Sequence, residues 1–144
     1  MVIRWAAPGH LPLLLPLVES FYAEDGHTLD VLSVRRALRP LLQDDRFGVV
    51  YLIETMGQIS GYAVVTWEWS VKRSGRDALL DEIFVEEPTS GLGGRAIEEI
   101  ADDLKARSIP RIHLETEASN HRARAFYRDH GFESDDSIWM SRPL

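Results

Sequence analysis

The chain has 144 residues, no cysteine and a formal net charge of −7 at pH 7. This length can bury a hydrophobic core without covalent cross-links, and we expect residues 1–144 to form a single domain. The missing cysteines exclude disulfides, thiolate metal ligands and a cysteine nucleophile, and the acidic charge argues against a protein that binds nucleic acid by neutralising phosphates.

The amino-terminal residues M-V-I-R-W-A-A-P-G-H contain no apolar core followed by a cleavage site, as a secretory signal would. Residues 11–18 are rich in leucine, but the run is too short to span a bilayer and two prolines interrupt it. We therefore expect a cytoplasmic protein with no membrane partner.

The first 42 residues predict one strand and two helices. Residues 2–6 suit a strand, which a proline and a glycine then end. An amphipathic helix ending near Glu24 is indicated by apolar residues at i, i+3, i+4 and i+7, namely Leu14, Leu17, Val18 and Phe21. Residues 30–42 predict a second helix, in which Pro40 indicates an early stop or a kink.

Three strands in succession follow. Residues 48–54, 59–69 and 78–85 are rich in β-branched and aromatic side chains, and the turn sequences M-G-Q and S-G-R-D separate them. Because the connections are short, we expect an antiparallel meander.

The last third of the chain alternates helices and strands. A helix after residue 94 carries an apolar stripe, residues 111–116 suit a strand, a helix begins at Asn120, and a final strand is expected near residues 138–142. The resulting order, β-α-α-β-β-β-α-β-α-β, indicates an α/β domain whose mixed, mostly antiparallel central sheet is flanked by helices.

A glycine-rich segment, T-S-G-L-G-G-R-A-I, lies between the third meander strand and the next helix. Glycines let backbone N–H groups crowd around an anion, and the helix amino terminus adds the positive end of its dipole. These properties suit a pyrophosphate, although a tight turn alone also explains the glycines. The spacings G-x-G-x-x-G and G-K-[ST] are absent, which excludes Rossmann and Walker loops.

A second segment, N-H-R-A-R-A-F-Y-R-D-H-G-F, covers residues 120–132. Asn120 can cap a helix with its side-chain oxygen, and Gly131 can end that helix in a left-handed conformation. Tyr127 is thereby fixed on a short helix just before the chain becomes extended again. Core packing is the alternative role for this tyrosine.

Together these segments resemble the GNAT superfamily of N-acetyltransferases. The resemblance covers essentially the whole chain and is carried best by L-D-E-I-F-V, G-L-G-G-R-A-I, L-E-T-E and the segment from Asn120. The layout is also similar to the diamine and polyamine acetyltransferases. It implies the GNAT fold and transfer of an acetyl group from acetyl-coenzyme A to an amine.

The resemblance also implies where the cofactor binds. Backbone groups of Phe84 and Val85 would pair with the pantetheine arm, Asn120 would meet the same arm, and Tyr127 would approach the thioester sulfur. The pyrophosphate would be held by backbone N–H groups of Ser90, Gly91, Leu92, Gly93, Gly94 and Arg95. The family usually carries a basic residue at the place of Ser90, in a loop one residue longer, and Arg95 could partly replace that charge.

Acetylation of an amine needs a base, because a lysine-like amine with a pKa of about 10.4 arrives protonated. Asp81 and Glu82 are the candidates. Adjacent strand residues face opposite sides, so only one of them faces the cleft. If side chains alternate strictly along the strand, Leu80 and Phe84 lie on the same face as Glu82. This does not decide whether Asp81 or Glu82 faces the cleft. We favour Glu82 and keep Asp81 as the alternative.

Tyr127 is the candidate general acid, because a phenol can donate a proton to the departing thiolate. The backbone N–H of Val85 is the candidate donor to the oxyanion. The five histidines show no metal-ligand spacing, so no metal is predicted.

The acceptor pocket is predicted from Tyr22, Glu24, Trp67 and Trp69, because aromatic and acidic side chains together suit an ammonium group. The leading hypothesis is therefore an N-acetyltransferase acting on a small cationic amine. Acetylation of a protein amino terminus or lysine and a non-catalytic acyl-coenzyme A sensor are the alternatives. A homodimer is compatible with the sequence.

Overall fold

The computed structural model describes residues 1–144, apart from the side chain of Thr89. The elements are, in chain order, β1 (Val2–Trp5), η1 (Pro8–His10), α1 (Leu11–Glu24), α2 (Val31–Gln43), β2 (Gly48–Thr55), β3 (Gln58–Ser70), β4 (Gly75–Val85), η2 (Pro88–Ser90), α3 (Leu92–Ala106), β5 (Ile112–His113) and α4 (His121–Asp129).

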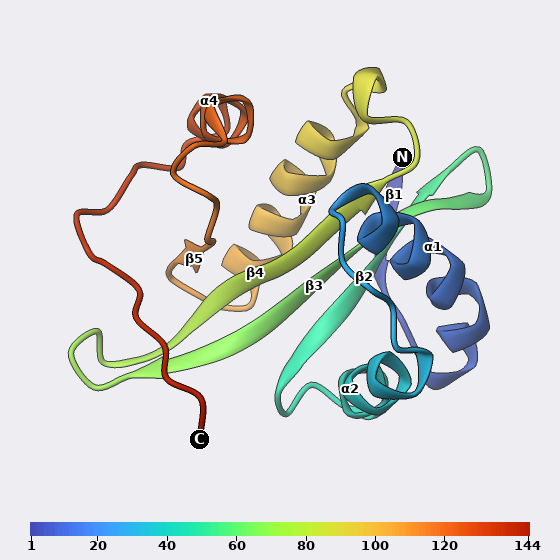
Figure 1. Ribbon diagram of the computed structural model, residues 1–144, viewed down its shortest axis with the longest axis horizontal. Coiled ribbons are helices and arrows are strands. Elements are labelled where there is room, and N and C mark those ends of the chain that lie inside the picture. The colour runs from blue at the N-terminus through green and yellow to red at the C-terminus, as the bar shows by residue number, and fades with distance from the viewer.

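The five strands form one open sheet in the order β1-β2-β3-β4-β5 (Figure 1). Neighbours from β1 to β4 are antiparallel, whereas β5 is parallel to β4. This confirms the mixed, mostly antiparallel sheet and the meander of three long strands. Among the described residues, no helix is long and apolar enough to cross a membrane.

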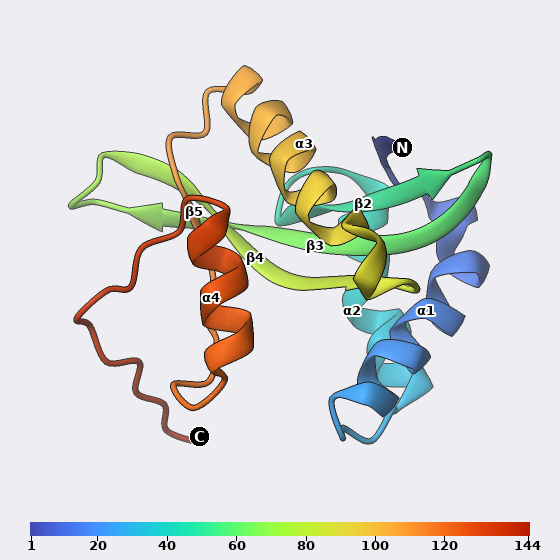
Figure 2. The same ribbon diagram turned by 90° about the horizontal axis from the view of Figure 1, so that it is seen from above.

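Helices cover both faces of the sheet, with α1 and α2 on one side and α3 on the other (Figure 2). Strand β2 is apolar from residue 49 to residue 53, and the packing of its two faces shows why. Its residues Val50 and Leu52 belong to the core under α1 and α2, while Val49 and Tyr51 belong to the core under α3. A strand with both faces covered needs no polar residues.

Helix α4 lies beyond β5 at the edge of the sheet, and its carboxyl end meets α3 (Figure 2). The helix begins as predicted, since Oδ1 of Asn120 accepts the backbone N–H of Ala123 at 3.1 Å. Its apolar side turns toward the core under α3, where Tyr127 packs.

The strand predicted near residues 138–142 is wrong, because the chain from residue 133 to residue 144 is exposed and forms no strand. Asp135 instead accepts hydrogen bonds from the backbone N–H (3.0 Å) and hydroxyl (2.9 Å) of Ser137, which form a local turn just before the predicted strand. Residues with a high propensity for strands form a strand only when a neighbouring strand is available for pairing.

Candidate functional site

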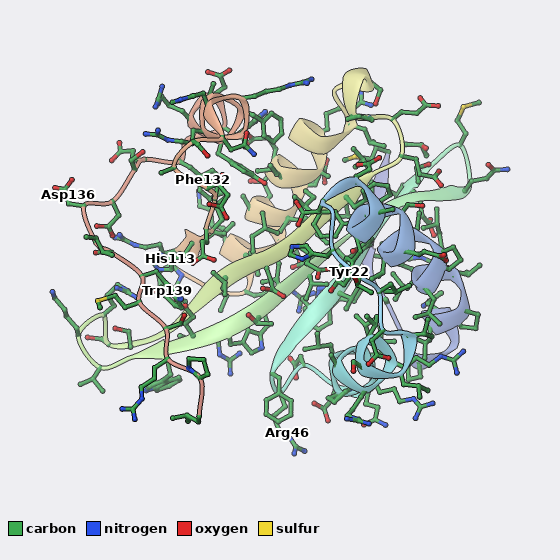
Figure 3. The ribbon with its side chains drawn as sticks, in the orientation of Figure 1. Tyr22, Arg46, His113, Phe132, Asp136 and Trp139 are labelled. Atoms are coloured by element: carbon green, nitrogen blue, oxygen red, sulfur yellow. The ribbon has the colours of Figure 1, made fainter. Side chains whose placement is uncertain are left out.

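A carboxylate held by two phenols lies where β4 passes α1. The hydroxyl of Tyr22 donates to Oε1 of Glu82, and the hydroxyl of Tyr62 donates to Oε2, each at 2.8 Å. Figure 3 marks Tyr22 where α1 lies in front of the sheet. Because α1, β3 and β4 each supply one side chain, the folded core fixes the orientation of this carboxylate.

Aromatic rings surround this group. The ring of Phe21 lies 5.7 Å from that of Tyr22, 6.4 Å from that of Tyr62 and 6.1 Å from that of Phe84. Burial, followed by the hydrogen bond to Glu82 and its charge, raises the pKa of Tyr22 to about 12. Burial likewise raises the pKa of Tyr62. Both phenols therefore keep their protons at neutral pH and act as donors.

A β-bulge determines which way Glu82 faces. In the pairing of β3 with β4, Val64 is opposite Glu82 and Val65 is opposite Leu80, so Asp81 is the extra residue. The bulge breaks the alternation along β4. Leu80 packs under α3, whereas Phe84 packs under α1. The expectation that Leu80 shares the face of Glu82 is therefore wrong.

Asp81 is exposed as a whole residue, but the surrounding protein shields its carboxyl group from part of the solvent. This desolvation raises the pKa of Asp81 above the usual value. The charge of Asp81 also contributes to the raised pKa of Tyr22. Both candidate bases and one phenol thus lie in the same electrostatic environment.

The outer edge of β4 is open beside this group. Strand β5 pairs with β4 only at Ala78 and Leu79, so the pairing ends before Asp81 is reached. Figure 1 shows β4 continuing well past β5. An extended ligand can add to such an edge through backbone hydrogen bonds, and this stretch includes Phe84 and Val85.

The glycine-rich turn joins β4 to α3. Gly91 has a φ of 75°, the left-handed conformation that glycine adopts without strain. The Ser90 hydroxyl donates to the carbonyl of Glu87 at 2.7 Å and accepts the backbone N–H of Leu92 at 3.3 Å. Ser90 therefore stabilises the turn, and Arg95 is exposed one turn into the helix.

Helix α4 packs tightly against the start of α3. A Cβ atom on Gly94 would lie 2.7 Å from the ring of His130, so only a glycine allows this approach. Nδ1 of His130 is 2.9 Å from Oε1 of Glu98. The amino end of α3 and the carboxyl end of α4 thus form one contact beside the glycine-rich turn.

Tyr127 packs among apolar residues under α3 and contacts two further rings, Phe126 at 5.2 Å and Phe132 at 5.7 Å between centroids. Burial raises its pKa above the ordinary value for a phenol. Tyr127 therefore carries its proton at neutral pH, and it packs against a different core cluster from Tyr22 and Tyr62, the phenols that hold Glu82.

The model of the acetyltransferase (GNAT) family matches residues 15–132, which is most of the chain. The chain belongs to this family. It is an N-acetyltransferase, and the resemblance seen in its sequence is confirmed.

A curated relative, the uncharacterised N-acetyltransferase YhfO of Bacillus subtilis (strain 168), is 25% identical over 137 residues, covering 94% of this acetyltransferase and 91% of YhfO. A possible acetyltransferase from Clostridium difficile 630 has the same fold, with a TM-score of 0.88, 22% identity and coverage of 99% and 97% of the two chains. An integron cassette protein from the mobile metagenome of Cole Harbour Salt Marsh is 27% identical, with a TM-score of 0.84 and coverage of 99% and 90%.

Of the residues predicted for the acceptor pocket, the acetyltransferase brings only Tyr22 into contact with Glu82. Nε1 of Trp67 donates to the carbonyl of Asp45 at 2.6 Å, and Trp69 is exposed on the β3–β4 hairpin. Both tryptophans lie further along β3 than Val64, the residue opposite Glu82. Glu24 is exposed at the end of α1.

Sequence reasoning missed Tyr62 as a partner of Glu82. The available signal was a phenol in the buried strand G-Y-A-V-V, because a buried tyrosine hydroxyl needs a hydrogen-bond partner. Within the described part of the chain, no three histidine, aspartate or glutamate side chains are grouped as a metal site requires.

Proposed function

We propose that this enzyme transfers the acetyl group of acetyl-coenzyme A to the primary amine of a small cationic molecule. The observation that carries the proposal is the Glu82 carboxylate, fixed by two phenols near the unpaired edge of β4. Direct transfer of an acetyl group requires that the base and the thioester be held close together. A fixed carboxylate beside a strand edge that can bind the pantetheine arm meets this requirement.

The residues present fit the cofactor that the family uses. The backbone of Phe84 and Val85 would pair with the pantetheine arm along the open edge of β4. The pyrophosphate would lie against the backbone N–H groups from Ser90 to Arg95, where the first turn of α3 leaves amides without intrahelical acceptors. Asn120 would contact the pantetheine. Bound there, the cofactor supplies an activated acetyl thioester.

Glu82 acts as the base that removes the proton from the arriving ammonium group, directly or through a water molecule. A carboxylate offers about four lone-pair positions, and the two phenols use two of them, so acceptor capacity remains. Asp81, with its raised pKa, is the alternative base.

The neutral amine nitrogen would form a bond to the thioester carbonyl carbon and lose its second proton to solvent water, and the carbon–sulfur bond would then break. The backbone N–H of Val85 stabilises the oxyanion between these two events. Tyr127 donates its proton to the departing thiolate and is later reprotonated from solvent. Its environment, buried among apolar residues, keeps the phenol in the protonated form that a general acid needs.

A cationic acceptor is favoured by the charges near the carboxylate. Asp81 and Glu82 both raise the pKa of Tyr22, so two negative charges act on one aromatic ring beside the proposed base. An ammonium group gains from such carboxylates and from the faces of aromatic rings. The net charge of −7 attracts cations at longer range.

The test measures thiol release from acetyl-coenzyme A with a panel of diamines, polyamines, amino sugars and peptides. We expect the wild type to acetylate a small cationic amine, Glu82→Gln to lose most activity, and Tyr127→Phe to lower kcat about 100-fold or more with unchanged cofactor affinity. Tyr51→Phe is the matched control, because Tyr51 is a buried tyrosine in a hydrogen bond elsewhere in the core.

Three results would contradict parts of the proposal. Turnover unaffected by Tyr127→Phe removes Tyr127 from its role as acid. Acetylation of peptides alone indicates a protein acetyltransferase. Tight cofactor binding in calorimetry with no turnover on any amine indicates an acyl-coenzyme A sensor.

A further inference from the structure

A hollow of about 390 Å³ lies between the β3–β4 hairpin and the loop that follows α3. Three arginines line it, namely Arg73, Arg76 and Arg107, and the described residues contribute no acidic side chain to its lining. A guanidinium group presents its N–H donors in a planar fork that matches the oxygens of an anion. In a chain with a net charge of −7, this hollow therefore favours a negatively charged ligand.

Two of these arginines are oriented by carboxylates that lie outside the lining. Nε of Arg73 donates to Oδ2 of Asp77, a residue that is only 1% exposed. Nε of Arg107 donates to Oδ2 of Asp103 at 3.0 Å. In both pairs the carboxylate accepts only from Nε among the described residues, so the Nη donors are left for a ligand.

Aromatic rings orient two of the three guanidinium groups. The guanidinium carbon of Arg107 lies 3.8 Å from the ring centroid of Trp5, and that of Arg76 lies 5.3 Å from the ring centroid of Trp67. The Arg76 guanidinium takes part in no hydrogen bond or ion pair within the described residues, so all of its donors are free. The three side chains thus form a set that is positioned before any ligand arrives.

Two serines in the lining have an unusual backbone. Ser74 has a φ of 65° and Ser108 a φ of 63°, in the left-handed region that glycine normally occupies. Ser108 follows α3 at the place where the N–H of Ile109 bonds to the carbonyl of Leu104, a helix ending that usually contains glycine. A serine at such a position adds a hydroxyl group at the cost of backbone strain, and such strain is concentrated at functional sites.

We propose that this hollow binds a small molecule that carries a phosphate group. A phosphate monoester has three free oxygens and close to two negative charges, so it can accept from more than one guanidinium, whereas a carboxylate offers a single pair of oxygens. The ring of Trp69, which is 76% exposed, and Pro110 are available to contact the rest of the ligand. The volume lies within the range of about 300–1,000 Å³ that is typical of small-molecule sites.

The proposed site is separate from the acetyl-transfer site. Arg76 is opposite Trp69 in the pairing of β3 with β4, whereas Glu82 is opposite Val64, and six residues of a strand span about 20 Å. Figure 1 shows the β3–β4 hairpin at the opposite end of the sheet from the turn that precedes α3. The phosphate ligand would therefore bind without occupying the proposed acceptor or cofactor positions, and the inference goes beyond the proposed function.

The test is a titration of the full chain with phenyl phosphate, followed by ¹H–¹⁵N nuclear magnetic resonance. We expect the backbone amides of Gly75 and Ser108, which line the hollow, to shift until the site is saturated. Benzoate has the same ring with a carboxylate, and we expect it to bind about 10-fold more weakly or worse. Equal affinity for benzoate would overturn the assignment of a phosphate ligand.

Arg76→Gln should weaken the binding of phenyl phosphate about 10-fold or more, because a hydrogen bond to a charged group is lost. Arg36→Gln is the matched control, since Arg36 is an exposed arginine on α2 and its loss changes the net charge equally. We expect this control to bind as the wild type does, and the same spectra show that each variant is folded. Unchanged binding by Arg76→Gln, equal weakening by Arg36→Gln, or no saturable shift in the wild type would each overturn the inference. Shifts confined to the amides of residues 91–94 would place the phosphate in the glycine-rich turn and overturn it as well.

Discussion

Replacing Tyr62 by phenylalanine removes one of the two donors to Glu82 and leaves the rest of the ring in place. The Tyr62 side chain is fully buried, and its hydroxyl is 2.8 Å from Oε2 of the carboxylate. A hydrogen bond to a charged group contributes about 1.5–3 kcal/mol to stability. Because Glu82 is partly exposed and water can replace the donor, we expect a loss of about 1–2 kcal/mol.

For a chain of this length, that loss lowers the melting temperature by roughly 3–8 °C. The two phenols fix the orientation of the Glu82 carboxylate, so removing the Tyr62 hydroxyl should also weaken catalysis. If about 1–2 kcal/mol of this orienting energy is lost from the transition state, kcat/KM falls roughly 5–30-fold.

The assay is kcat/KM at neutral pH, with the melting temperature, for wild type, Tyr62→Phe and Tyr51→Phe. Tyr51 is an equally buried tyrosine whose hydroxyl donates to Oδ2 of Asp103 at 2.7 Å in the other core. We expect Tyr51→Phe to lose similar stability with an unchanged kcat/KM. An unchanged kcat/KM in Tyr62→Phe, despite the lower melting temperature, would refute the assignment of Glu82 as the base.

Two further predictions concern the α3–α4 contact and a buried carboxylate. Gly94→Ala should displace the His130 ring, break its contact with Glu98 and lower the melting temperature, although alanine favours a helix by about 1 kcal/mol over glycine. Adding His130→Ala should recover part of the loss, and a stabilised Gly94→Ala would contradict the tight contact. Asp77→Asn should cost about 1–3 kcal/mol at neutral pH. Burial alone would raise the pKa of Asp77, but hydrogen bonds, first that from His113, hold it below the usual value. A carboxylate whose pKa is lowered by folding stabilises the protein at pH values above its unfolded-state pKa, and this stabilisation is lost as the pH falls through its folded-state pKa. The difference in free energy of unfolding between wild type and Asp77→Asn should therefore shrink below about pH 4. A difference that stays constant on acidification would show that Asp77 does not act through its charge.

Much of the fold could be predicted because its signals are local. Helical spacing of leucines located α1, and turn sequences separated the three long strands of the meander. The final strand could not be predicted correctly, because a strand depends on an edge within reach as well as on its own residues. Ile138 and Trp139 have strand-forming side chains, yet they pair with none of the five strands.

The site was predicted in part for the same reason. Asn120, Tyr127 and the glycine-rich turn stand in continuous segments, so their spacing could be read directly. The choice between Asp81 and Glu82 depends on a bulge that inverts the faces of β4, and a bulge leaves no fixed pattern in the sequence. Tyr62 joins the group only because β3 and β4 pair in one register, which is a long-range property.

The placement of Glu82 and Tyr127 in two separate cores bears on how this protein can evolve. Substitutions around Tyr22 alter the core under α1, and substitutions around Tyr127 alter the core under α3. Tyr22 and Tyr127 pack in different cores, so substitutions around one leave the packing of the other unchanged. Under the proposed function, a change of acceptor amine could therefore be selected around Tyr22 without repacking Tyr127.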